Sequence, residues 1–256
     1  MGFTTAISYI KKNFTKHMEK EDQNQLPLHG QINGVIKLPE NIFVHTLING
    51  QLIEKPMEKE QIIKAIGKLT FDHLEQLKIH KYYIDVTPGN EKFIQIVEDP
   101  SGNILETYYA SEFNSIIPET QETIDIFLGN NENGVGVGTF NLGADMLEKF
   151  NEKQLTTFFG EQETIEYHRD STEPEDVFVS PYKGKEIVRT DHTDQTKGFE
   201  KEITFMPYYR KLENDQEFLW FSTEYTTNVN HDATKNNLYV KMFFAVKIDA
   251  NSIGVF

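Results

Sequence analysis

The side chains best suited to bind a metal ion lie near position 192. Asp191, His192 and Asp194 bring oxygen and nitrogen ligands together within four residues, and His231 lies beside another acid further along the chain. Carboxylate and imidazole ligands suit divalent metal ions. The spacing matches neither a helical His-Glu-x-x-His site nor a calcium loop. The pattern therefore favours polar turns, with a metal centre as the weaker hypothesis.

A second hypothesis is a small-ligand or enzyme site in a cleft between two β-rich halves of the chain. Arg169 and Arg210, together with Asp191 and His192, are the polar groups that we expect at such a cleft. Aromatic surroundings of the kind abundant in this chain suit a small ligand. No Gly-x-Ser-x-Gly elbow, phosphate loop or kinase motif set is present. The sequence leans away from an enzyme and implies no cofactor.

The first twenty residues have the pattern of an amphipathic helix. Apolar residues recur every three or four positions, and lysines repeat every four positions on the opposite side. The predicted interaction helix carries Phe3, Ile7, Ile10, Lys12, Phe14, Lys16 and Met18. Such a stripe can pack on the protein itself, on a partner helix or on a membrane surface. Membrane contact through a few lysines and apolar side chains would be weak and sensitive to salt.

Composition narrows the classes of function that this chain can have. The chain has 256 residues, no cysteine and a net charge of −15, although residues 1–20 hold four lysines against one glutamate. Disulfides and thiolate chemistry are therefore excluded, and nucleic acid is an improbable partner for so acidic a chain. No apolar run is long enough for a spanning helix. We expect a cytoplasmic protein, with contact at the inner face of the membrane as an extension of that hypothesis.

The helix would be joined to a β-rich body by a linker. Residues 19–25 contain nothing apolar, so residues 1–25 are predicted as helix and linker and residues 26–256 as the globular domain. That domain is expected to be α+β and mainly antiparallel β-sheet. It can be one unit or two packed halves, 26–142 and 163–256.

Turn residues and the alternation of apolar residues indicate where the individual strands and helices lie. Asp99-Pro100-Ser101-Gly102 predicts a hairpin between strands 93–98 and 104–110, and Asn49-Gly50 predicts another between 43–48 and 51–54. Alternation predicts strands at 124–128 and 238–249, and residues 218–225 are apolar on both faces, as in a covered central strand. Residues 144–159 are predicted to be helical, and 58–77 fits a helix or a strand pair.

Short segments across residues 26–249 occur in an order that resembles a known bacterial family. They include 26–28, 32–36, 65–69, 82–85, 93–96, 167–169, 206–210 and 217–224. In that order they resemble the YjfK-like family, whose function is unknown. The resemblance implies a protein encoded beside coiled-coil membrane-stress proteins and small membrane proteins, a setting that would suit the N-terminal helix. Our leading hypothesis is a non-enzymatic accessory or binding protein whose helix contacts a partner coiled coil or the membrane.

Overall fold

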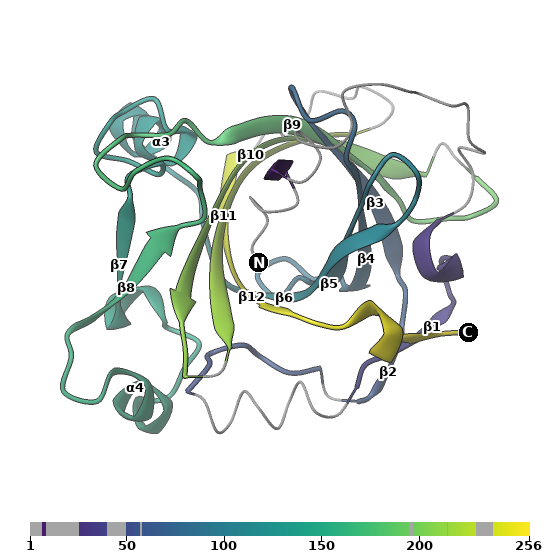
Figure 1. Cartoon of the computed structure of the whole chain (residues 1–256), viewed down its shortest axis with the longest axis horizontal. Helices are drawn as coiled ribbons and strands as arrows, with labels where there is room; N and C mark the ends of the chain where they lie inside the picture. Colours follow the sequence, from purple (N-terminus) through teal and green to yellow (C-terminus); the bar gives the residue numbers. More distant parts are fainter. Residues whose placement is uncertain are drawn as a thin grey trace.

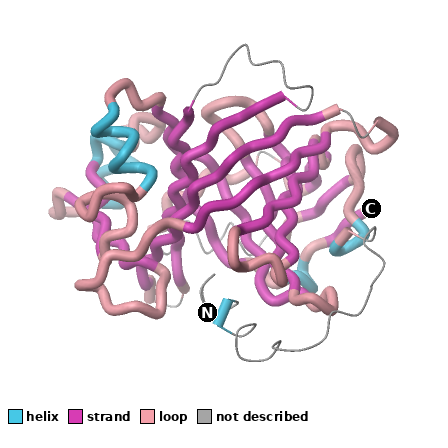
Figure 2. Tube along the Cα trace, turned by 90° about the horizontal axis from the view of Figure 1, so that it is seen from above, coloured by secondary structure: helices cyan, strands magenta, loops and turns pink. Residues whose placement is uncertain are grey.

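Eight antiparallel strands close into a barrel, which is seen end on in Figure 1. The computed structural model describes residues 7–8, 26–39, 50–56, 58–194, 197–213, 215–228 and 238–256. Around the barrel the strands follow the order β3 (Ala65–Phe71), β4 (Lys78–Asp85), β5 (Lys92–Glu98), β6 (Ile104–Ile116), β12 (Leu238–Lys247), β11 (Gln216–Asn228), β10 (Gly198–Lys211) and β9 (Tyr182–Arg189). Pairing of β9 with β3 completes the ring. Figure 2 shows the long strands running obliquely side by side.

Smaller elements cover part of the outside of the barrel. They are the sheet β13 (Gly254–Val255), β1 (Val35–Lys37) and β2 (Glu60–Ile62), the antiparallel strand pair β7 (Thr139–Gly143) and β8 (Thr164–Arg169), the helices α3 (Gln121–Leu128) and α4 (Glu152–Phe159), and 3-10 turns at Pro27–His29, Ala144–Met146 and Ala250–Ser252. In Figure 1 helices α3 and α4 and the β7–β8 pair lie on one side of the barrel. The expectation of a mainly antiparallel β protein is confirmed.

Strands from both ends of the globular region are hydrogen bonded to one another. The late strand β12 lies between β6 and β11, and β9 pairs with the early strand β3. The ranges 26–142 and 163–256 therefore contribute strands to the same barrel.

Four predicted strands are present where the sequence places them. Strands β5 and β6 form the hairpin around Asp99, whose carbonyl accepts a hydrogen bond from the amide of Gly102. Strand β12 covers most of the predicted 238–249 segment. Strand β11 pairs with β10 on one side and β12 on the other, as expected for a segment that is apolar on both faces.

The strand predicted at 124–128 is wrong, because these residues belong to helix α3. The side chain of Thr120 accepts a hydrogen bond from the amide of Thr123 at the start of the helix. Gly129 ends it in the left-handed conformation, with φ of 66°. Capping at both ends outweighs the alternation of Ile124, Ile126 and Leu128.

Three other predictions are only partly right or are wrong. The predicted helix 144–159 is not continuous: only the 3-10 turn Ala144–Met146 and α4 are helical, and α4 begins at a capping box formed by Asn151 and Gln154. Residues 51–54 form no strand, because Leu52 and Ile53 pack into the core and the amide of Leu52 is bound by a carboxylate of Glu217. Their predicted partner strand lies outside the described residues. The stretch 58–77 contains the strands β2 and β3, so the strand alternative was the correct one.

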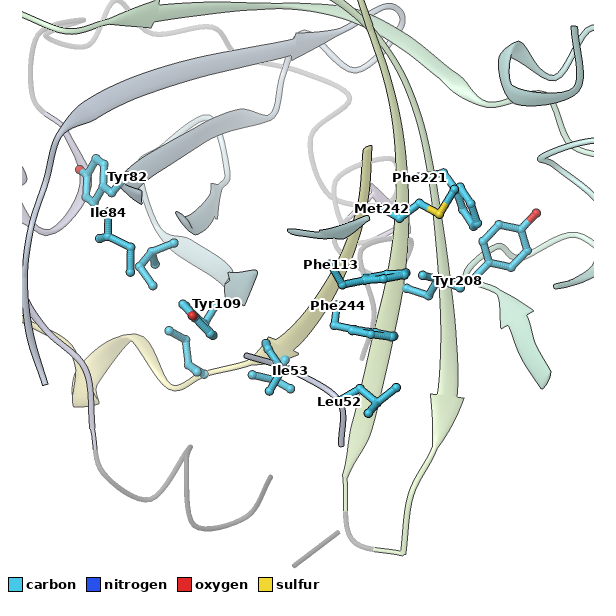
Figure 3. Packing of buried hydrophobic residues seen from close by; sticks show 14 of the residues in the cluster. Leu52, Ile53, Tyr82, Ile84, Tyr109, Phe113, Tyr208, Phe221, Met242 and Phe244 are labelled. Atoms are coloured by element: carbon cyan, nitrogen blue, oxygen red, sulfur yellow. The ribbon is translucent and has the colours of Figure 1, made fainter. Parts of the chain in front are cut away.

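The barrel wall separates two apolar cores. The outer core lies between the outside of the barrel and the elements that cover it, and Figure 3 shows Phe113 stacked on Phe244 there, with ring centroids 4.1 Å apart. The inner core fills part of the barrel with rings that include Phe93, Phe218 and Trp220. Strand β11 is covered on both sides, which explains why residues 218–221 are continuously apolar.

The predicted N-terminal helix lies outside the described residues except at positions 7 and 8, which have helical backbone conformation. Ile7 is 4% exposed and belongs to the inner core of the barrel. This residue is therefore packed against the body of the protein. No helix within the described ranges is long and apolar enough to cross a lipid bilayer.

Candidate ligand site in the barrel

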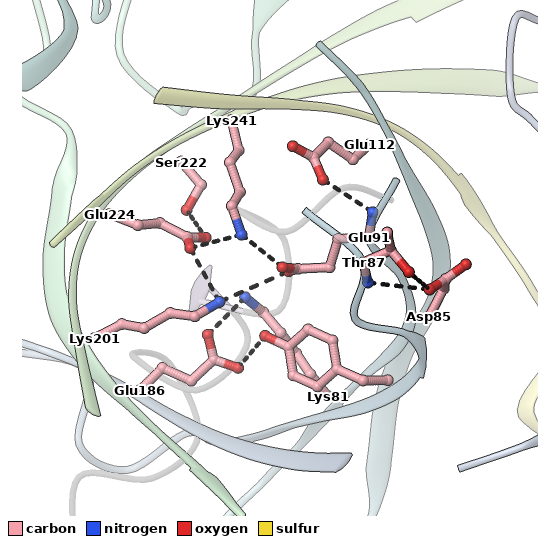
Figure 4. A network of polar contacts seen from close by, with 11 residues as sticks. Lys81, Asp85, Thr87, Glu91, Glu112, Glu186, Lys201, Ser222, Glu224 and Lys241 are labelled. Carbon is pink, nitrogen blue, oxygen red and sulfur yellow. Dashed lines mark hydrogen bonds and ion pairs between the residues drawn. The ribbon is translucent and has the colours of Figure 1, made fainter. Parts of the chain in front are cut away.

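One part of the barrel interior holds a layer of charged side chains. We call it the charged layer, and it consists of Lys81, Glu91, Glu112, Glu186, Lys201, Glu224 and Lys241, shown in Figure 4. All of them except Glu91, which lies just before β5, belong to barrel strands, on which successive residues face the barrel interior and the outer core in turn. Met242 and Phe244 on β12, for example, belong to the outer core, whereas Lys241 and Phe243 point inward. Charged residues are rarely buried without partners.

Glu224 is the centre of this layer. Its carboxylate lies 3.0 Å from the ammonium group of Lys201 and 3.1 Å from that of Lys241, and it accepts a hydrogen bond from the hydroxyl of Ser222. Burial would raise the pKa of Glu224, but the two lysines lower it well below its ordinary value. Glu91 adds a second carboxylate, 2.6 Å from Lys241. Glu224 is therefore ionised and holds both cations in place.

Glu186 forms the other half of the charged layer. It accepts hydrogen bonds from Lys81 at 3.1 Å and from the hydroxyl of Tyr83 at 2.5 Å. Burial and the neighbouring Glu186 raise the pKa of Tyr83 well above its ordinary value, so its hydroxyl keeps its proton. A Cβ at Gly67 would come within 2.0 Å of the Glu186 carboxylate. Only glycine leaves room for this buried acid.

Glu112 lies in the charged layer with one oxygen lacking a hydrogen-bond partner. Its other oxygen accepts a hydrogen bond from the amide of Glu91. Burial raises the pKa of Glu112, partly opposed by that hydrogen bond and by Lys241. Because the folded protein binds this proton more tightly than the unfolded chain, Glu112 makes stability fall as the pH rises from the ordinary carboxyl range into the raised one.

We therefore expect Glu112→Gln to be more stable than the unsubstituted protein at neutral pH, by on the order of 1 kcal/mol, because glutamine keeps an acceptor for the amide of Glu91 and carries no charge to bury. The advantage should disappear as the pH falls below the ordinary carboxyl range, where Glu112 is protonated in both the folded and the unfolded state. Urea unfolding across this pH range measures the difference. If Glu112→Gln is instead less stable, and the loss grows with pH, the ionised carboxylate of Glu112 stabilises the protein through its interaction with Lys241.

Three neutral polar residues beside the charged layer have no hydrogen-bond partner for their polar side-chain atoms. We call Gln95, Tyr108 and Trp220 the neutral set. Gln95 is 1% exposed, and both its amide oxygen and its amide nitrogen are unpaired. It lies opposite Lys81 on one side and opposite Tyr108 on the other. The Tyr108 ring meets the Trp220 ring at 71°, with centroids 5.3 Å apart.

Unpaired buried groups of this kind are rare in native proteins, and each requires an explanation such as a bound water or ligand. Here three of them, with donor and acceptor capacity, lie on strands β5, β6 and β11 of one barrel interior. An eight-stranded barrel is wide enough to be filled by side chains or to hold one small ligand. The neutral set is therefore the part of the molecule best suited to bind a small polar molecule.

A surface pocket of about 480 Å³ lies where β6 begins and β12 ends. Its lining consists of Ile104, Leu105, Glu106, Thr107, Asp215, Lys247, Ile248, Asp249, Ala250 and Asn251. Glu106 is paired with Lys247 and is opposite Val97 of the inner core. Two residues further along the same strand face lies Tyr108. Glu106 of the pocket lining and Tyr108 of the neutral set therefore share one face of β6, whereas Thr107 lies between them on the opposite face, where it is opposite Ile96 of the outer core.

The two predicted cleft arginines have structural contacts outside the barrel interior. Arg169 donates hydrogen bonds to the backbone carbonyls of Gly136, Glu173, Pro174 and Val177, at distances between 2.6 and 3.4 Å. Arg210 pairs with Glu217 at 2.9 Å and donates to the carbonyl of Gly50. Both lie near the pairing of β8 with β10, where Arg169 is opposite Tyr208. Their bonds stabilise loops around the barrel.

The predicted metal residues lie in a turn. Asp191 accepts hydrogen bonds from the amide and hydroxyl of Thr193 and pairs with Lys197 at 3.0 Å. These contacts, the Thr193 hydroxyl first, lower the pKa of Asp191. His192 and Asp194 belong to the same turn, and His231 lies outside the described residues. Within the described ranges no group of three or more acidic or histidine side chains is arranged to hold a metal.

Sequence reasoning missed the charged layer and the neutral set, although β12 carries a usable signal. One face of the predicted strand mixes Lys241 and Lys247 with Phe243 and Ala245. A solvent-facing strand surface rarely combines phenylalanine and alanine in this way. The mixture indicates a face that is buried and polar at once.

The fold and site define a closed antiparallel barrel with a buried, charged interior. The chain matches no protein-family profile, and no solved structure matches it. Among curated proteins it is 31% identical over 83 residues to phosphoribosylaminoimidazole-succinocarboxamide synthase from Enterococcus faecalis. This match covers 32% of the present chain and 35% of that synthase, so the chain spans about a third of the relative's length.

Proposed function

We propose that this protein is a non-enzymatic binding protein that holds a small polar molecule in its barrel. The observation that carries the proposal is the neutral set, above all Gln95, whose buried amide has no partner for either polar atom. A molecule with a donor and an acceptor would satisfy both. The partial similarity to a synthase covers too little of either chain to carry an activity over.

Native mass spectrometry of the full chain, as purified, tests this proposal. We expect a noncovalent adduct of up to a few hundred daltons, the size that an eight-stranded barrel can enclose. The affinity of Gln95→Leu for this molecule should be at least tenfold lower, because a lost hydrogen-bond partner in a buried site costs about 1–3 kcal/mol. Gln121→Leu is the matched control, since Gln121 is exposed on α3.

Detection of only the bare polypeptide mass, together with identical spectra for the two variants, would reject the proposal. Trp220 offers an independent check because it is the single tryptophan of the chain and belongs to the neutral set. Its emission should shift when the adduct is removed by unfolding and refolding. An unchanged emission would show that the adduct lies elsewhere.

The predicted contacts with a membrane-stress coiled coil or the inner membrane face stay predictions. They depend on residues 1–20, of which only positions 7 and 8 are described. The burial of Ile7 favours internal packing of that position. The barrel site and an N-terminal contact are compatible functions of one binding protein.

A further inference from the structure

Gln95 restricts the chemistry of a ligand more than the rest of the neutral set does. It lies on β5 two residues from both Phe93 and Val97 of the inner core, so its side chain faces the barrel interior. The residue is 1% exposed, and neither polar atom of its amide has a hydrogen-bond partner. A primary amide holds a donor and an acceptor side by side in one plane. A ligand that satisfies both must therefore present an acceptor beside a donor in the same plane.

The other two members of the neutral set add hydrogen-bond donors. Tyr108 is opposite Gln95 in the pairing of β5 with β6, and its hydroxyl has no partner. Burial, and then the charges of Glu106 and Asp170, raise the pKa of Tyr108 well above its ordinary value, so the hydroxyl keeps a proton to donate. The indole N–H of Trp220 is a second donor without a partner, on a ring whose centroid is 5.3 Å from that of Tyr108. These two donors suit a second acceptor atom on the ligand.

The two charged side chains next to the neutral set on β4 and β6 each have a partner of opposite sign. Lys81, which is opposite Gln95 on β4, pairs with Glu186 at 3.1 Å. Glu106, on the same face of β6 as the neutral-set tyrosine, pairs with Lys247. A charged ligand would have to compete with these partners, and it would also lose its own hydration on burial. An uncharged ligand avoids both costs.

Aromatic rings surround the polar atoms of the neutral set. The Trp220 ring lies nearly parallel to that of Phe93, at 22° with centroids 6.4 Å apart. The Tyr108 ring meets that of Phe218 at 85°, with centroids 5.3 Å apart. All four rings belong to the inner core. Aromatic faces and edges of this kind favour a planar π system over an aliphatic molecule, because flat rings stack on them in defined geometries.

We propose that the neutral set binds an uncharged, planar heterocycle that carries an N–H group beside a carbonyl oxygen. The proposal rests on the proposed function and names the class of its ligand. The ring N–H donates to the amide oxygen of Gln95, and the carbonyl oxygen accepts from its amide nitrogen. Tyr108 and Trp220 donate to a second acceptor on the ring.

Isothermal titration with uracil tests the class of ligand, on the full chain after unfolding and refolding to remove any bound molecule. We expect saturable binding. Each of three analogues removes one feature and should bind at least tenfold more weakly. They are 1,3-dimethyluracil, which lacks the N–H groups, 5,6-dihydrouracil, which lacks the planar π system, and orotate, which adds a negative charge.

Two variants test the residues that would hold the ring. Gln95→Leu should weaken the binding of uracil at least tenfold. Tyr108→Phe keeps the aromatic ring and removes only a hydroxyl that has no partner in the protein, so it should weaken binding several-fold without lowering stability. Gln121→Leu, on the exposed surface of α3, should leave binding unchanged.

Equal affinity for uracil and 1,3-dimethyluracil, or the same uracil affinity in Gln95→Leu and Gln121→Leu, would overturn the proposal. If Gln95→Leu fails to fold, unchanged uracil affinity in Tyr108→Phe would overturn it instead. An adduct in the native mass spectrum with no binding of uracil would reject the heterocycle and keep the binding function. Absence of both an adduct and uracil binding would reject both.

Discussion

Replacing Glu224 with glutamine should lower the free energy of unfolding by about 3–5 kcal/mol, because it removes one partner from a buried ionic network. Lys201 and Lys241 would lose the carboxylate at 3.0 and 3.1 Å and would share the remaining Glu91. Urea unfolding monitored by Trp220 fluorescence measures the change. Glu202→Gln, on the exposed face of the neighbouring strand, should change stability by less than about 0.5 kcal/mol.

A double-mutant cycle separates the cost of the unpaired charge from the loss of packing. Lys201→Met added to Glu224→Gln should recover part of the lost stability, because one buried cation is removed with its partner. A loss of less than about 1 kcal/mol in Glu224→Gln would contradict the buried network. It would mean that water reaches both ammonium groups in the folded protein.

Replacing Ile7 with alanine should lower the free energy of unfolding by about 2–5 kcal/mol, the range for truncating a buried isoleucine. Ile7 is 4% exposed and belongs to the inner core. Ile117→Ala is the matched control, since Ile117 is 57% exposed and should tolerate the same truncation with little change. Thermal and urea unfolding of the full chain measure both variants.

This comparison also decides between the two uses of the N-terminal stripe. An internal Ile7 makes its truncation costly in the isolated protein. If Ile7 instead contacts a membrane or a partner, Ile7→Ala should change stability as little as Ile117→Ala does. It should then weaken binding in liposome flotation or in a pull-down with the partner. Equal stability of the two variants would refute internal packing of Ile7.

Local signals in the sequence were sufficient for the strands and turns that depend on neighbouring residues. The Pro100-Ser101-Gly102 turn defined the β5–β6 hairpin, and continuous apolarity marked β11 as covered on both sides. Helix α3 was misassigned because alternation was given more weight than the capping by Thr120 and Gly129. The glycines of 134–138 lie in a set of turns where another backbone segment approaches closely, since a Cβ at Gly138 would lie 2.0 Å from the carbonyl oxygen of Glu175.

The candidate site could not be derived in the same way, because its contacts join residues distant in the chain. Lys81 and Glu186 are 105 positions apart, and Glu91 and Lys241 are 150 apart. Each looks like an ordinary surface charge until the barrel closes around it. The same holds for Gln95, whose missing partners become evident only when the strands on both sides are known.

The position of β12 has a consequence for how the polypeptide acquires its structure during synthesis. This strand is the last of the barrel to leave the ribosome, yet it lies between β6 and β11. Until it arrives, a nascent chain has two unpaired sheet edges, and such edges are templates for association with other chains. A prematurely terminated product that ends before residue 238 would keep both edges, so it should be a target for chaperones and prone to aggregate.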